Sequence, residues 1–271
     1  MRHILSLNEA WQFRKENQEP ELLNLPHTWN AIDGMDGGGD YWRGKGIYEK
    51  TLTRDQLPQG EEIFLEIPAA NSSADVFVNG AKLCHHDGGY SCFRCRLTDH
   101  IADETVIRIE VDNAPNRTVY PQMADFTFYG GLYRDVNVLC VSESHFDLDY
   151  YGAPGIKVTP VLEGENANVE VEVFLTNRRQ GQSVRYTILD AQGNVVDSCQ
   201  KEETSARFVI EHAHKWHGRK DPYLYTAKAE LVEEGEVLDN VSARFGCRSF
   251  RIDPEQGFIL NGESYPLRGV S

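Results

Sequence analysis

The sequence lacks long apolar runs. Its 271 residues contain no stretch of 18 apolar residues, and the short apolar patch in the N-terminal MRHILSLNEAWQF is interrupted by Asn8 and Glu9. A membrane-spanning helix needs about 20 apolar residues, and a secretory signal needs an unbroken apolar core. The sequence therefore predicts a cytoplasmic protein with no membrane partner.

Positive charge is also scarce. The chain has 27 basic residues against 42 acidic ones, which gives a net charge of −15. A surface this acidic repels phosphate backbones and anionic lipids. Nucleic acid is therefore excluded as an expected partner, although the charge itself identifies no other partner.

Cysteine is present, but not in a metal-binding arrangement. Cys92 and Cys95 form a C-x-x-C pair, which would suit zinc or redox chemistry. However, GGYSCFRCRLTD alternates like a strand, in which residues three apart point to opposite faces, and no second ligand pair has zinc-site spacing. The histidines of EHAHKWHGRKDPYLY are expected to be structural or exposed. We predict no metal site and six reduced thiols of an intracellular protein: Cys84, Cys92, Cys95, Cys140, Cys199 and Cys247.

A helical period is missing as well. Nearly every periodic segment alternates with period two, as in EEIFLEI, TVIRIEVDN and NVEVEVFLTN, and Asn79-Gly80 and Glu234-Gly235 mark hairpin turns. Many short strands separated by turn signals are typical of antiparallel sandwiches. The sequence therefore predicts an all-β fold.

A change in loop composition near Ser142 predicts a domain boundary. Glycine and aromatic residues crowd the loops before it, whereas the strands after it are simpler. Residues 1–142 are predicted to form a jelly roll and residues 143–247 an immunoglobulin-like sandwich. Residues 248–271 contain the Asn261-Gly262 turn and stop inside an apolar run, so we expect them to begin a further domain. Without that domain, an exposed apolar strip on an unpaired strand is expected at Phe258, Ile259, Leu260, Leu267 and Val270.

Several motifs together resemble glycoside hydrolase family 2, the family of β-galactosidases, β-glucuronidases and β-mannosidases. They occur in family order: LPHTWN (25–30), ADVFVNGAKLCHHDGGYSCFRCRLTDHI (74–101), FYGGLYRDVNVL (128–139), KWHGRKDPYLYTAKAEL (215–231) and GFILNGESYPLRGVS (257–271). The resemblance implies the jelly-roll sugar-binding domain and the immunoglobulin-like domain of such an enzyme. It also implies that the chain ends at the first strand of a missing (β/α)₈ barrel.

The resemblance further implies a parent enzyme that removes terminal β-linked sugars with retention, most similar to the β-galactosidase branch. Retaining glycosidases need two carboxyl groups about 5 Å apart. The family's acid/base follows an asparagine, and Asn8-Glu9 is the one Asn-Glu pair in the sequence, in a region that resembles a structural strand. We therefore expect no catalytic residue here and no hydrolysis by this chain alone. The alternatives are a β-glucuronidase fragment and a free-standing carbohydrate-binding or adhesion module.

Three residues are implied as substrate-binding. Asp125 matches an aspartate that binds glycone hydroxyls, and in some galactosidases an alkali cation, as suits a carboxylate that accepts two hydrogen bonds. Asp40, in GGGDYWRG, lies in a loop that approaches the active site in relatives, and Trp42 could stack on a sugar ring, whereas Trp29 and Trp216 are expected to pack. We expect no cofactor in this chain, and the resemblance is compatible with magnesium or sodium in or near the parent's barrel. The expected partner is a carbohydrate substrate bound through the missing barrel, and a homo-oligomer is left open.

Overall fold

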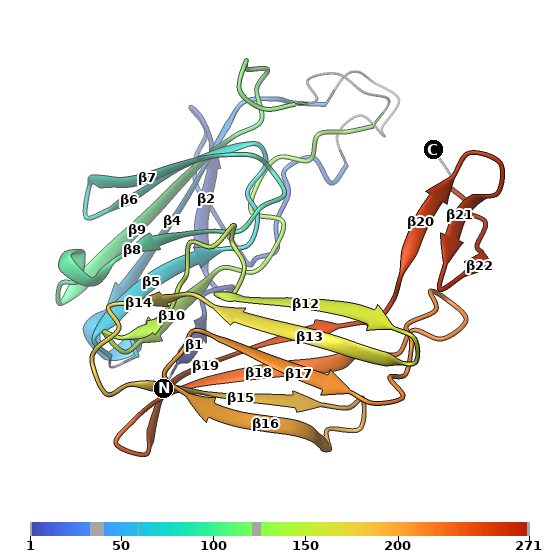
Figure 1. The fold of residues 1–271 in the computed structure, drawn as a ribbon. Coiled ribbons are helices and arrows are strands. Elements are labelled where there is room, and N and C mark those ends of the chain that lie inside the picture. Colours follow the sequence, from blue (N-terminus) through green and yellow to red (C-terminus); the bar gives the residue numbers. More distant parts are fainter. Residues whose placement is uncertain (1, 33–40, 59, 121–125, 270–271) are drawn as a thin grey trace. The chain divides into compact units, whose positions relative to one another are not determined.

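The computed structural model describes residues 2–32, 41–58, 60–120 and 126–269 (Figure 1). In these residues the regular elements are strands, apart from the 3₁₀ helices η1 (Arg54–Gln56) and η2 (Thr98–His100). The predicted all-β fold is thus confirmed. Neither described helix is long and apolar enough to cross a membrane. The chain divides into two compact units between Glu143 and Ser144, where the sequence analysis placed a boundary after residue 142.

The first unit contains two antiparallel sheets. The four-stranded sheet has the order β1 (His3–Ser6), β10 (Asn137–Val141), β5 (Glu62–Ile67) and β8 (Phe93–Arg96). The six-stranded sheet has the order β3 (Glu21–Leu23), β2 (Trp11–Lys15), β4 (Lys45–Thr53), β9 (Glu104–Asp112), β6 (Ser73–Val78) and β7 (Ala81–Asp87). Both sheets contribute to one apolar core, as expected for a sandwich.

The alternation seen in the sequence builds this core. Every second residue of β5 and of β9 is buried, including Leu65 and Ile109. Trp11 and Tyr48 are the largest fully buried side chains, and they meet edge to face with ring centroids 6.5 Å apart. Burying each large apolar side chain contributes about 1.5–3 kcal/mol, so this shared stripe holds the two sheets together.

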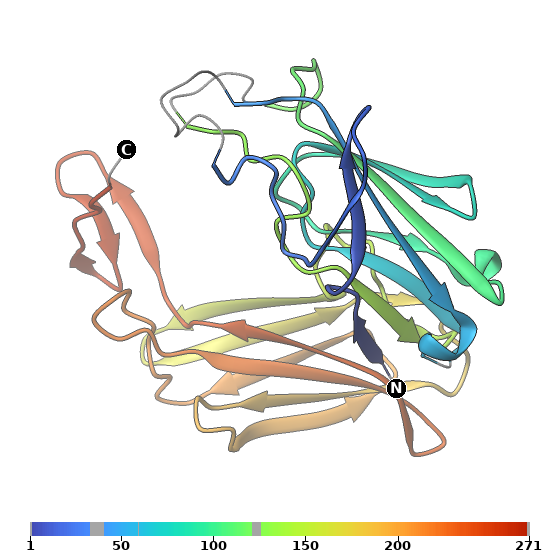
Figure 2. The same ribbon diagram turned by 180° about the vertical axis from the view of Figure 1, so that it is seen from behind.

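The second unit is an immunoglobulin-like sandwich, whose two layers can be followed in Figure 1 and from behind in Figure 2. One layer is β12 (Ile156–Glu163), β13 (Asn166–Val173) and β17 (Ser205–Ile210). The other is β16 (Val195–Lys201), β15 (Ser183–Leu189), β18 (Tyr225–Glu233) and β19 (Glu236–Phe245), and a short pair joins β11 (His145–Phe146) to β14 (Leu175–Thr176). Tyr225 begins β18, and its hydroxyl accepts a 2.9 Å hydrogen bond from the backbone N–H of His214, the corner contact typical of this fold.

A small sheet of β20 (Phe250–Asp253), β21 (Gly257–Leu260) and β22 (Glu263–Ser264) ends the described chain. Asn261 and Gly262 form the predicted tight turn, with φ angles of 50° and 85°. Asn261 also donates a 2.9 Å hydrogen bond to the carbonyl oxygen of Trp216, and Arg219 N–H donates to the Tyr265 hydroxyl at 3.1 Å. These contacts fix the small sheet against the segment before β18.

The prediction of an exposed apolar strip is wrong for Ile259 and Leu260. They are only 2% and 1% exposed, and β21 is paired on both sides. The strip was inferred from a single strand, but β20 and β22 supply the missing neighbours. Leu267 is 69% exposed, as predicted, while Val270 lies outside the described residues. The apolar exposure that the sequence analysis missed lies on β20, where Phe250 and Ile252 are 63% and 81% exposed.

The prediction of six reduced thiols is also wrong, because Cys84 and Cys95 form a disulfide. Cys84 lies on β7, the edge of the six-stranded sheet, and Cys95 lies on β8, the edge of the four-stranded sheet. The bond therefore joins the two sheets at one margin of the sandwich. Spacing along the chain could not reveal this pairing, because only the folded sheets bring the two edges together. Because two of the six cysteines are oxidised, cysteine usage no longer supports an intracellular location.

We expect this crosslink to stabilise the first unit. The two cysteines are 11 residues apart, and closing a loop of this size stabilises a protein by about 3 kcal/mol. In non-reducing buffer, Cys84→Ser should lower the free energy of unfolding by about that amount in a urea titration. Dithiothreitol should do the same to the unchanged chain and add nothing to the variant. Equal stability of the two chains in both buffers would contradict the crosslink.

Candidate functional site

The three residues predicted to bind substrate do not all lie in the described part of the chain. Asp40 and Asp125 fall in the ranges 33–40 and 121–125, outside the described residues. Trp42 is described and half-buried. The flanking segments can therefore be examined, and they meet at two buried asparagines.

Asn113 is the residue that joins these flanking segments. It follows β9 directly and is fully buried. Its side-chain N–H groups donate to the carbonyl oxygen of Phe128 at 2.9 Å and to the side-chain oxygen of Asn30 at 3.1 Å. Its own side-chain oxygen accepts from the backbone N–H of Gly44 at 2.9 Å. One amide thus holds both the segment after residue 40 and the segment after residue 125.

Asn30 completes the arrangement from the other side. It is 1% exposed, and its side-chain oxygen also accepts a 2.8 Å hydrogen bond from Gly130 N–H. Its side-chain nitrogen donates to the carbonyl oxygen of Trp42 at 2.8 Å. Buried polar groups are costly unless they are paired. The two amides satisfy each other and the surrounding backbone, so the positions of Trp42 and Phe128 are fixed relative to one another.

Glycines let the chain pass close to the tryptophans here. A Cβ on Gly130 would lie 2.2 Å from the indole of Trp29, and a Cβ on Gly44 would lie 2.7 Å from the indole of Trp42. Gly131 has a φ of 122°, a conformation that side chains rarely adopt. The glycine-rich stretch 130–131 thus lets the backbone pass close to the tryptophan rings.

The aromatic rings form a continuous group beneath the site. Trp29 is 7% exposed and stacks on Phe13 with centroids 5.9 Å apart, which agrees with its predicted packing role. Trp42 meets Trp29 edge to face at 5.6 Å. The ammonium group of Lys15 lies 4.9 Å from the centroid of the Trp42 ring. The described part of the site is therefore an aromatic platform with a cation above its outer ring.

A second polar contact holds the segment after residue 125 from its far side. The side-chain nitrogen of Asn71 donates to the carbonyl oxygen of Tyr129 at 2.8 Å, and its backbone exchanges hydrogen bonds with Gly131. Sequence reasoning missed Asn30, Asn71 and Asn113 as supporting residues. A usable signal existed for two of them, because Asn30 ends the motif LPHTWN and Asn113 ends the alternating stretch TVIRIEVDN, each just before a loop.

Titratable groups below the platform are structural. His27 Nδ1 and the Tyr48 hydroxyl are 2.8 Å apart. Burial lowers the pKa of His27 and raises the pKa of Tyr48, so both are neutral near pH 7. No cluster of three metal-ligating side chains occurs among the described residues. The described residues of the site therefore hold backbone segments in position and pack aromatic rings against one another.

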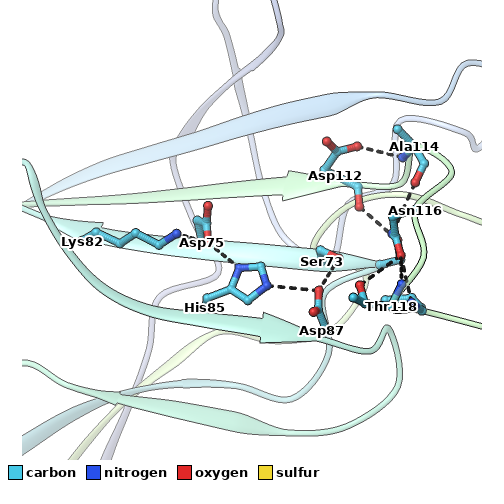
Figure 3. A network of polar contacts seen from close by, with 11 residues as sticks. Ser73, Asp75, Lys82, His85, Asp87, Asp112, Ala114, Asn116 and Thr118 are labelled. Carbon is cyan, nitrogen blue, oxygen red and sulfur yellow. Dashed lines mark hydrogen bonds and ion pairs between the residues drawn. The ribbon is translucent and has the colours of Figure 1, made fainter.

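A separate polar cluster lies on β6 and β7, shown in Figure 3. The ring of His85 lies between Asp75 and Asp87, with nitrogen–oxygen distances of 2.6 and 3.1 Å. Lys82 also contacts Asp75 at 2.8 Å, and Ser73 donates to Asp87 at 2.7 Å. Lys82 forms an ion pair with Asp75, and His85 in its protonated form joins Asp75 to Asp87, so the cluster is an ion-pair clamp across the two strands.

Comparison with known proteins identifies the family. Residues 154–248 match the family model of the glycosyl hydrolases family 2. A β-glucuronidase of Bacteroides fragilis is 33% identical over 99% of this chain and 41% of its own length. The crystal structure of an FMN-binding β-glucuronidase from Facaelibacterium prausnitzii L2-6 has 43% identity and a TM-score of 0.94, over 100% of this chain and 43% of that chain.

The chain belongs to glycoside hydrolase family 2. The family resemblance inferred from motif order is thereby confirmed. A β-galactosidase of Thermoanaerobacter pseudethanolicus is also similar, with 24% identity over 98% of this chain and 36% of its own length. The chain spans about two-fifths of the length of the family 2 relatives that it matches. The substrate-binding roles of Asp40, Trp42 and Asp125 stay predictions.

We expect the buried amide network to be a major source of local stability. Asn113→Ala removes three side-chain hydrogen bonds and leaves Gly44 N–H and Phe128 C=O without those partners, which should cost about 3 kcal/mol. Urea titration would measure this loss. Hydrogen exchange should become faster at the amides of Gly44 and Gly130. The control Asn168→Ala, on the outer face of β13, should change stability by less than about 0.5 kcal/mol. A similar effect of both variants would contradict the network.

The clamp on β6 and β7 should make stability weakly pH-dependent. Hydrogen bonds to Asp75 and Asp87 raise the pKa of His85 above its ordinary value of 6.5. The protonated ring therefore contributes stability that is fully present below pH 6.5 and lost as pH rises through the folded-state pKa. Because the ring is half-exposed, the contribution should be under about 1 kcal/mol. An NMR titration should show the raised pKa, and Asp87→Asn should lower it. An unchanged pKa in that variant would contradict the assignment.

Proposed function

We propose that this chain forms the two N-terminal β-sandwiches of a family 2 β-glucuronidase, an enzyme that hydrolyses terminal β-glucuronides. The observation that carries the proposal is similarity along the whole chain to two relatives of that name, at 33% and 43% identity. The chain spans only 41% and 43% of those relatives, which supports a role as part of a larger enzyme. The sequence analysis favoured β-galactosidase, but the B. fragilis and F. prausnitzii relatives are both named β-glucuronidases.

The chain's proposed role is to position one side of the sugar site. Asn30 and Asn113 fix the segments that follow residues 40 and 125, and these segments carry Trp42 and Phe128. A retaining glycosidase also needs an acid/base and a nucleophile about 5 Å apart, which we assign to a barrel beyond this chain. FMN appears in the name of the F. prausnitzii relative, and the proposal assigns FMN no residue here.

The small C-terminal sheet supports a neighbouring domain. Phe250 and Phe258 stack with centroids 5.9 Å apart, and Ile252 beside them is 81% exposed. Apolar side chains gathered on one surface usually mark an interface. We propose that the remainder of the family 2 enzyme covers this surface.

A β-galactosidase is the second candidate, because the T. pseudethanolicus relative of that name is similar over 98% of the chain. The two sugars differ in the group at the sixth carbon, a carboxylate in glucuronides and a hydroxymethyl group in galactosides, and in the configuration at the fourth. The choice therefore depends on recognition of one negative charge and of the configuration at the fourth carbon.

Chromogenic substrates test the proposal directly. The 271-residue chain alone should hydrolyse neither 4-nitrophenyl β-D-glucuronide nor the matching β-D-galactoside. A protein that extends this chain through the barrel should prefer the glucuronide, with kcat/KM higher by at least about 100-fold. A preference for the galactoside would select the second candidate. Turnover by the chain alone that disappears on substituting one of its residues would overturn the proposed division of labour.

Asp125 gives a further test in the extended protein. If its carboxylate binds glycone hydroxyls, Asp125→Ala should lower kcat/KM by about 100-fold, equivalent to about 2.7 kcal/mol of lost charge-assisted contacts. The control Asp197→Ala, at an exposed position on β16, should leave kcat/KM unchanged. Unchanged kinetics in the Asp125 variant would remove it from the site.

A further inference from the structure

Lys50 occupies an inward-facing position on the six-stranded sheet. Tyr48 and Leu52, two residues before and after it on β4, are 0% and 4% exposed. Ile107, its register partner on β9, is fully buried. Residues two apart on a strand, and residues directly opposite on neighbouring strands, share one face of a sheet. A partly buried lysine therefore interrupts a row of core side chains.

The Lys50 nitrogen is held in place without a partner of opposite charge. It donates a 2.5 Å hydrogen bond to the backbone carbonyl oxygen of Glu9 and lies 5.9 Å from the centroid of the buried Trp11 ring. Among the residues that the structure describes, Lys50 forms no ion pair, whereas Lys45 on the same strand contacts Glu110 at 3.0 Å. The backbone carbonyl thus orients the nitrogen without neutralising it.

This environment favours the neutral amine. Burial lowers the pKa of Lys50 below its ordinary value of 10.5, against a smaller opposing effect of the Glu9 carboxylate. The hydrogen bond to Glu110 instead raises the pKa of Lys45. Only the unprotonated amine is a nucleophile, so at a given pH a larger fraction of Lys50 than of Lys45 is reactive.

An open cavity of about 610 Å³ adjoins Lys50 and Glu9. Leucines and uncharged polar residues make up the rest of its lining: Leu5, Ser6, Leu7, Asn8, Leu52 and Gln56. The side-chain oxygen of Gln56 already accepts the N–H of Thr53 at 2.9 Å, so its amide nitrogen is the group that can donate to a ligand. Cavities of this volume hold small molecules. This one suits a molecule with an apolar body and a single acceptor oxygen.

We propose that Lys50 is a covalent attachment site for small apolar aldehydes, which it holds as a Schiff base in this cavity. The neutral amine attacks the carbonyl carbon, and a C=N bond replaces the C=O bond. The carbonyl oxygen leaves as water with the two amine hydrogens, so the step needs no oxidant or reductant. A lysine desolvated in apolar surroundings is suited to this chemistry, because its amine is neutral and the released water leaves for the solvent. The inference is independent of which glycoside the enzyme hydrolyses.

Reductive trapping on the 271-residue chain tests the proposal. The chain is treated with benzaldehyde and sodium cyanoborohydride, which reduces the C=N bond to a stable amine, and peptide mass spectrometry gives the modified fraction of each lysine. Lys50 should be modified at least about fivefold faster than Lys45, and faster than Lys220, whose side chain is 68% exposed. Benzyl alcohol, an unreactive analogue of the same shape, should protect Lys50 alone, because it occupies the cavity.

Matched variants separate the cavity from the amine. Leu5→Gln makes one apolar wall polar and should slow benzaldehyde labelling of Lys50 about threefold. Labelling by glycolaldehyde, which has no apolar body, should be unchanged in that variant. Lys50→Arg keeps the positive charge but forms no Schiff base, and it should remove the labelling that benzyl alcohol suppresses.

Two results would overturn the proposal. One is labelling of Lys50 that is no faster than labelling of Lys45. The other is preferential labelling of Lys50 that benzyl alcohol leaves unchanged, because the cavity would then contribute nothing. Both measurements use the unchanged chain, so they decide the question even where a variant fails to fold.

Discussion

The hydrogen bond between the side chains of Asn30 and Asn113 is the constraint on which the candidate site depends. Each amide is almost fully buried, and each also bonds the backbone of a segment far away in the sequence. An amide suits this task because it donates and accepts at once, so two of them can satisfy each other and several backbone groups without introducing a charge. Removing either side chain leaves buried backbone groups without hydrogen-bond partners. The positions of both segments therefore depend on both asparagines.

The core and this polar network have different tasks. Alternating apolar residues on β5 and β9 bring the two sheets together, but such packing is tolerant of sequence and does not fix where a loop leaves a strand. The hydrogen bonds of Asn30, Asn71 and Asn113 fix those loop positions. Each such bond joins the side chain to one particular backbone group. A site supported by these bonds can hold Trp42 in one orientation while the rest of the sandwich serves as a scaffold.

Charge gives the chain its clearest link between composition and recognition. A net charge of −15 disfavours anionic ligands over most of the surface, so a site for an acidic sugar needs a local excess of positive charge. On β6 and β7 of the first unit, cations and carboxylates are paired in the clamp of Asp75, Lys82, His85 and Asp87. The distinction between glucuronide and galactoside concerns one carboxylate and the configuration at the fourth carbon, so charge is one of the two properties that the enzyme must recognise.

The sequence by itself determined the all-β fold, the turns at Asn79-Gly80 and Asn261-Gly262, and the family, because period-two alternation and ordered motifs are local properties of the chain. It also gave Trp29 a packing role, and this side chain is buried in the core. Only the tertiary structure decided that Cys84 bonds Cys95, that Ile259 and Leu260 are covered, and that Asn30 meets Asn113 across 83 positions of sequence. Each of these depends on which strand edges and loops become neighbours in space. A one-dimensional pattern specifies the face on which a side chain lies, but not what meets that face after folding.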